Sequence, residues 1–158
     1  MQDAKLQKAT LLSFTLKVWK DYRRGVPMSG HNAAIVYAMR HHTEWWAEWD
    51  LVYPAMARPE IGIENHLIHI HHDAEVKTRL DNKEPKQLSV LYQMLRDKGC
   101  DEFESIHTLA LALTEETWFT RENNQSFNMD RYVERAADYV KQTLARPHLV
   151  RSAKSKSY

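Results

Sequence analysis

The chain has 158 residues, of which 43% are hydrophobic, and a net charge of +1. These values favour a packed core and give no reason for nucleic acid as the main partner. The single cysteine, Cys100, excludes a disulfide within the chain and indicates a reducing compartment. The sequence contains neither a secretory signal nor an apolar run near the roughly 20 residues of a membrane span. We therefore expect a cytoplasmic protein that makes no contact with membranes.

The spacing of apolar residues predicts helices, and the low content of glycine (4) and proline (5) agrees. The first helix covers about residues 3–24 and the second about residues 30–49. A loop at 53–62 precedes a third helix over about residues 64–81. The fourth begins at Pro85, the fifth opens with a capping box of Asp101 and Glu104, and Asn128 caps the sixth. The expected fold is an all-α bundle of five to six helices.

We expect one domain, residues 1–146, followed by a basic, flexible tail, residues 147–158. The tail and the basic end of the first helix, KVWKDYRR, are the only hints of a nucleic-acid partner. A solvated surface is the simpler interpretation of both segments. The chain contains no glycine-rich phosphate loop and no flavin motif, so neither a nucleotide nor a flavin is expected.

Histidines are concentrated in the third predicted helix, in the segment ENHLIHIHHD at residues 64–73. A helical wheel places His66, His69 and Asp73 in one narrow arc that faces the core. The same wheel turns His71 and His72 outward, toward solvent. The segment therefore contributes two or three inward candidates for a functional site.

Two further histidines occupy inward positions on other predicted helices. In the second helix, His42 shares a stripe with Ile35, Met39 and the three tryptophans Trp45, Trp46 and Trp49. In the fifth helix, His107 lies with Leu111 and Trp118 inside a stripe whose edge carries Glu115. The stripe is formed by Phe103, Ile106, Ala110, Leu113 and Thr117. A buried imidazole must find hydrogen-bond partners, and three of them in one small domain suggest that they converge.

Neutral imidazoles and carboxylates around an open position suit Zn²⁺, Fe²⁺ or Mn²⁺. The candidate ligands are His42, His66, His69, Asp73, His107 and Glu115. The spacing is not specific, because no H-E-x-x-H motif is present and an E-x-x-H occurs once, at Glu104–His107. A buried polar network without metal is an equally open interpretation of the same residues.

Two other functions compete with metal binding. The chain could be a non-catalytic helical subunit of a larger assembly or a homo-oligomer, which would explain its surplus tryptophans and basic tail. It could also transfer protons through a histidine–carboxylate pair. The sequence names no substrate, so whether the protein is an enzyme stays open.

Three segments resemble an uncharacterised bacterial family, the domain of unknown function numbered 1841. They are HTEWW at residues 42–46, PEIGIENHLIH at residues 59–69, and His107 followed by Glu115 and Trp118. The family pattern is H-P-E-Y-H, then N-P-F-L-H-x-x-x-H, then a histidine followed by E-x-x-W. The resemblance covers the middle of the chain, from His42 to Trp118. It implies a helical fold and no established activity.

The resemblance matches His42, Glu44, Asn65, His69, His107, Glu115 and Trp118 to family positions. Trp46 stands where the family has a second histidine, His66 replaces its proline, and Asp73 replaces the last histidine of its second motif. Aspartate in place of histidine can preserve metal binding, but tryptophan cannot. The resemblance therefore implies a divergent member with an altered site.

Overall fold

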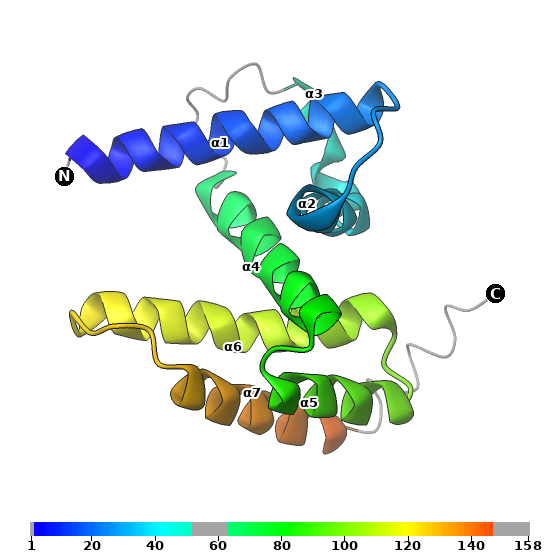
Figure 1. Cartoon of the computed structure of the whole chain (residues 1–158), viewed down its shortest axis with the longest axis vertical. Helices are drawn as coiled ribbons and strands as arrows, with labels where there is room; N and C mark the ends of the chain where they lie inside the picture. Colours follow the sequence, from blue (N-terminus) through cyan, green and yellow to red (C-terminus); the bar gives the residue numbers. More distant parts are fainter. Residues whose placement is uncertain (1, 52–62, 147–158) are drawn as a thin grey trace. The chain divides into compact units, whose positions relative to one another are not determined.

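The computed structural model describes the backbone of residues 2–51 and 63–146, which is all-α with no strand (Figure 1). The helices of its first part are α1 (Gln2–Arg23), α2 (Gly30–His41), the 3₁₀ turn η1 (Thr43–Trp45) and α3 (Trp46–Leu51). Its second part contains α4 (Ile63–Asn82), α5 (Lys86–Asp97), α6 (Glu102–Glu122) and α7 (Met129–Leu144). The predicted loop at 53–62 and tail at 147–158 lie outside the described residues.

The chain divides into two compact units, Met1–Ala74 and Glu75–Tyr158. The division falls within α4. The single domain expected from the sequence, residues 1–146, stays a prediction.

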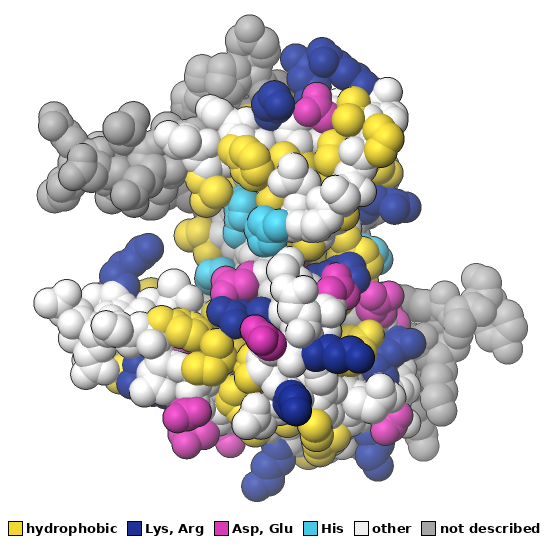
Figure 2. Space-filling model, in the orientation of Figure 1, with side chains coloured by type: hydrophobic (Ala, Val, Ile, Leu, Met, Phe, Trp, Pro, Cys, Tyr) yellow, Lys and Arg dark blue, Asp and Glu magenta, His cyan; other side chains and the backbone are white. Residues whose placement is uncertain are grey.

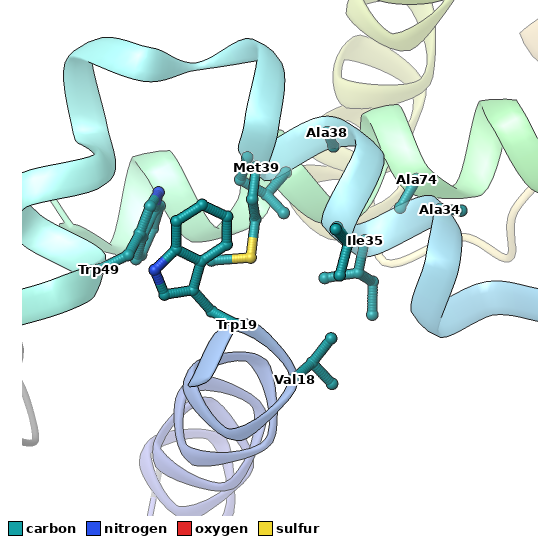
Figure 3. Packing of buried hydrophobic residues seen from close by; sticks show 10 residues of the cluster. Val18, Trp19, Ala34, Ile35, Ala38, Met39, Trp49 and Ala74 are labelled. Carbon is teal, nitrogen blue, oxygen red and sulfur yellow. The ribbon is translucent and has the colours of Figure 1, made fainter. Parts of the chain in front are cut away.

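The core of the first unit forms where α1 meets α2 and α3 (Figure 3). Trp19 of α1 is almost fully buried against Met39 of α2 and Trp49 of α3. Full burial of such large side chains stabilises the fold by about 2–3 kcal/mol each. The indole N–H of Trp19 donates to the Asp50 carboxylate at 2.8 Å, so the buried ring keeps a polar partner on α3.

The second unit packs α5, α6 and α7 against one another (Figure 1). Its buried side chains include Leu88, Leu95, Ile106, Leu109, Leu113, Tyr132, Ala136 and Val140. The Tyr132 hydroxyl donates to the backbone oxygen of Leu109 at 3.1 Å, which satisfies the buried phenol. Tyr132, Ala136 and Val140 recur at helical spacing and form the buried face of α7.

The predicted helix starts at Asp101 and Asn128 are confirmed. The Asp101 carboxylate accepts from the backbone N–H of Glu104 at 2.7 Å, and the Glu104 carboxylate accepts from the backbone N–H of Asp101 at 3.4 Å. The Asn128 side-chain oxygen accepts from the backbone N–H of Arg131 at 2.9 Å. Each bond satisfies an N–H group that the first helical turn leaves without a partner.

The continuous second helix predicted over residues 30–49 is wrong. Helix α2 ends at His41, and His42 adopts φ −98° and ψ 63° before the η1 turn. The break contains neither glycine nor proline. The Trp46 indole N–H donates to the Met39 backbone oxygen at 2.9 Å, which gives the helix end a partner.

The inward positions predicted for Leu111 and Trp118 on α6 are also wrong. Trp118 is 63% exposed and Leu111 is 37% exposed, whereas Ala112, Leu113 and Glu116 are buried. Ile106, Ala110 and Leu113 of the predicted stripe are buried as expected, and α7 packs against α6. The sequence pattern did not separate Leu111 and Trp118 from this stripe, because α6 carries apolar residues on more than one face.

The described helices do not combine the length and hydropathy that spanning a bilayer requires. On the visible face, basic and acidic side chains are interspersed (Figure 2). This mixture agrees with the net charge of +1.

A buried ion cluster joins α6 to α7. The Glu116 side chain is fully buried, and its carboxylate accepts from Arg131 Nε at 2.8 Å and from Arg135 Nε at 3.0 Å. Both guanidinium groups also lie over the Phe119 ring, 4.5 and 5.0 Å from its centroid. The bond from Arg131 lowers the pKa of Glu116, burial opposes this, and the bond from Arg135 adds to the lowering.

We expect Glu116→Gln to lower the free energy of unfolding by about 3 kcal/mol at neutral pH, because it leaves two arginines without their buried counter-charge. Because its folded pKa lies below 4.5, the contribution of Glu116 is fully present above 4.5 and is lost as the pH falls through the folded value. Urea unfolding at several pH values measures this difference.

Glu115→Gln is the matched control, because Glu115 is adjacent and 43% exposed in its pair with Arg135. An exposed pair of this kind is worth less than about 1 kcal/mol. Equal losses for the two variants would contradict the assignment of the stabilisation to Glu116.

Candidate metal centre

The centre of the first unit's polar cluster is a hydrogen bond between His42 and Asp73. His42 Nε2 lies 3.2 Å from Asp73 Oδ2, and both side chains are buried. Asp73 is on α4 and His42 is the residue that ends α2, so the bond joins segments 31 residues apart. A fully buried carboxylate needs such a partner, because leaving it unpaired costs several kcal/mol.

Glu44 binds the other nitrogen of the same ring. His42 Nδ1 lies 3.1 Å from Glu44 Oε1, so two carboxylates flank one imidazole. Burial lowers the pKa of His42, but the bonds to Asp73 and Glu44 outweigh it and the pKa is raised. Without metal, the ring donates a proton to each carboxylate when it is charged. Glu44 is 58% exposed, so solvent screens its share of the effect.

His69 completes a compact group in the first unit. The ligand atoms of His42, His69 and Asp73 lie within 4.8 Å of one another. The His69 ring packs edge-on against the His42 ring with centroids 5.3 Å apart. His69 and Asp73 are one helical turn apart on α4, which confirms that they share one face.

The spacing of these atoms is compatible with a bound ion. Two donors held about 2.0–2.2 Å from one tetrahedral Zn²⁺ ion stand roughly 3.3–3.6 Å apart. The 3.2 Å between His42 Nε2 and Asp73 Oδ2 is close to the lower end of that range. A metal ion can therefore replace the proton that these two atoms share, while the Nδ1–H of His42 stays on Glu44.

The structure gives His66 a different position from the other predicted ligands. Its ring stacks on the Trp45 indole with centroids 3.9 Å apart and planes at 13°. The His42 ring also stacks on Trp45, with centroids 4.1 Å apart and planes at 11°. His66 therefore contacts the group of three through an aromatic side chain.

The outward position predicted for His71 is wrong. His71 Nε2 lies 2.8 Å from the hydroxyl of the buried residue Thr15, which itself donates to the Leu11 backbone oxygen. Because that hydroxyl proton is already used, the His71 ring N–H donates to it. Burial, with smaller effects from His31 and His72, lowers the pKa of His71 to about 4. His71 is therefore neutral at physiological pH and packs α4 against α1.

The other two predicted ligands belong to the second unit. His107 on α6 stacks on Phe103 with centroids 5.8 Å apart, and it lines a pocket of about 360 Å³ with Thr108, Leu111 and Tyr139. The Glu115 carboxylate accepts from Arg135 Nη1 at 2.8 Å. Glu115 is thus held in an ion pair, and the ligand role of His107 stays a prediction.

Two carboxylates are not among the ligands that helical periodicity predicts, although the family resemblance matches Glu44. A continuous helix over residues 30–49 would turn Glu44 away from the stripe of His42, and the break at His42 brings it onto the imidazole. Glu116 lies on the stripe of Leu109 and Leu113, at a spacing that a helical wheel can reveal. The expectation that glutamate is exposed hid that signal.

Fold and site together define an all-α protein with a buried histidine–aspartate group. The chain belongs to the family described as Domain of unknown function (DUF1841), which matches residues 7–138. The match extends well beyond the stretch from His42 to Trp118 on which the resemblance was based. No curated protein and no solved structure matches the chain.

We expect Glu44→Gln to lower the pKa of His42 in metal-free protein, because it removes one of the two carboxylates that favour the charged ring. NMR titration of the His42 ring protons measures the change. Partial burial raises the pKa of Glu44, but bonds from its own backbone N–H and from His42 outweigh this, so Glu44 is ionised above 4.5.

Because the pKa of His42 is raised in the folded protein, the stability that its charged ring contributes depends on pH. The stabilisation from its charged ring is fully present below the ordinary value of 6.5 and is lost as the pH rises through the folded value. The difference in free energy of unfolding between wild type and Glu44→Gln should therefore be larger at pH 6 than at pH 9. The same difference in free energy of unfolding at pH 6 and at pH 9 would contradict a charged pair of His42 and Glu44.

Proposed function

We propose that this protein binds a divalent transition metal through His42, His69 and Asp73. The observation that supports the proposal is the mutual approach of their ligand atoms within 4.8 Å, with His42 and Asp73 buried. Two imidazoles and one carboxylate form a donor set that suits Zn²⁺, Fe²⁺ or Mn²⁺.

The surrounding residues favour binding. The Nδ1–H of His42 is held by Glu44, which fixes the ring and leaves Nε2 as the ligand atom. Asp73 supplies negative charge where water is excluded, so a divalent cation offsets the cost of burying the carboxylate. Asp73 stands where the family pattern has a histidine, and it preserves a ligand type at that position.

A metal held by three protein ligands keeps coordination positions open. There it could lower the pKa of a bound water or accept a substrate oxygen. The sequence also predicts His107 as a ligand, and the substitution His107→Ala tests that prediction separately.

We expect wild-type protein, purified without a histidine tag, to contain about one metal ion per chain by elemental analysis. Asp73→Asn keeps the volume of the side chain and removes its charge, and His69→Ala removes one imidazole. Each should weaken metal binding roughly tenfold or more, because a neutral amide oxygen is a much weaker ligand than a carboxylate and alanine offers no ligand atom.

His41→Ala is the control. His41 is exposed, and its Nδ1 lies 2.7 Å from the Tyr37 backbone oxygen of its own helix, so metal content should not change. Circular dichroism verifies that each variant is helical. Sub-stoichiometric metal that is unchanged in His69→Ala would mean that the group is a buried polar network without an ion.

A further inference from the structure

The Trp45 indole lies between two imidazole rings. Its centroid is 4.1 Å from that of His42 and 3.9 Å from that of His66, and the planes differ by 11° and 13°. Two parallel rings this close to one indole centroid would overlap if they shared a face. His42 and His66 therefore lie on opposite faces of Trp45.

The break after α2 produces this stack. His42 precedes the η1 turn and Trp45 is its last residue, with the Trp45 backbone N–H donating to the His42 backbone oxygen at 2.9 Å. Side chains three residues apart eclipse one another in a 3₁₀ turn, whereas an α-helix offsets them. The turn thus places the indole directly over the imidazole, which a continuous helix would not do.

The stack restricts the motion that would most disturb the ligand atom. Rotation of the His42 ring about its Cβ–Cγ bond would carry Nε2 away from Asp73 and would drive the ring edge into the indole. The bond to Glu44 alone is a weak restraint, because that carboxylate is 58% exposed and water competes for it. The Trp45 ring also meets the His69 ring edge-on, with centroids 5.9 Å apart. One indole therefore contacts both histidines of the group.

We propose that Trp45 is a positioning residue of the metal centre, which holds the His42 ring so that Nε2 points toward the ion. This inference rests on the proposed function. It assigns His66 to the far side of the indole, where it supports the stack and does not bind the same ion. Trp45 itself makes no bond to the metal.

The test compares Trp45→Leu, which keeps an apolar side chain without a ring face, with Trp45→Phe, which keeps a ring face. Competition titration of Zn²⁺ against a chromophoric chelator measures affinity. We expect a loss of about tenfold for Trp45→Leu, as for other residues that orient ligands. Trp45→Phe should stay within about threefold of wild type because it can still stack.

Trp118→Leu is the matched control, because Trp118 is 63% exposed on α6. It should bind Zn²⁺ as wild type does. Wild-type affinity in Trp45→Leu would overturn the positioning role while leaving the proposed function intact. Equal losses in Trp45→Leu and Trp45→Phe would also overturn it, because a general packing defect would then explain both.

A second readout uses metal-free protein. The Nδ1 proton of His42 that faces Glu44 should exchange slowly with water in the NMR spectrum of wild type and of Trp45→Phe, and quickly in Trp45→Leu. If wild type binds no Zn²⁺, the proposed function fails and this readout alone decides whether Trp45 fixes the ring. A slowly exchanging proton in Trp45→Leu would overturn the inference.

Discussion

The buried bond between His42 and Asp73 is the constraint on which the first unit depends. A carboxylate with no exposed surface must be neutralised, and one group that reaches it is His42, whose Nε2 lies 3.2 Å away. To do so, the chain has to leave the helical path after His41. Ending the helix here costs little free energy, because the Trp46 indole N–H supplies a partner for the Met39 carbonyl. The free energy gained by compensating the buried charge of Asp73 exceeds that cost.

The same break determines the surroundings of the site. It places Glu44 on the second nitrogen of the imidazole and stacks Trp45 on its face. A ring held at both nitrogens and covered on one face has few orientations available to it. A side chain that is already held in place loses little conformational entropy when it binds a metal ion, so this restraint favours binding. One local departure from helical geometry therefore accounts for most of the candidate centre.

The second unit also neutralises a buried carboxylate, but it does so with different groups. Glu116 is as buried as Asp73, but it is neutralised by two arginines one turn apart on α7. These cations occupy both carboxylate oxygens and leave no position for an ion. The contrast with Asp73 is chemical: guanidinium groups stay charged, whereas an imidazole can lose its proton and accept a metal in its place.

Patterns within single helices predict the all-α class, the helix starts at Asp101 and Asn128, and the shared face of His69 and Asp73, because these depend on neighbours close in the chain. Contacts between segments determine that α2 ends at His41, that His71 packs on Thr15, and that Trp118 is exposed. Each of these depends on which other helix covers a given face. The periodicity of a sequence indicates which face of a helix is apolar. It does not indicate which distant residue forms a hydrogen bond with a buried polar group on that face.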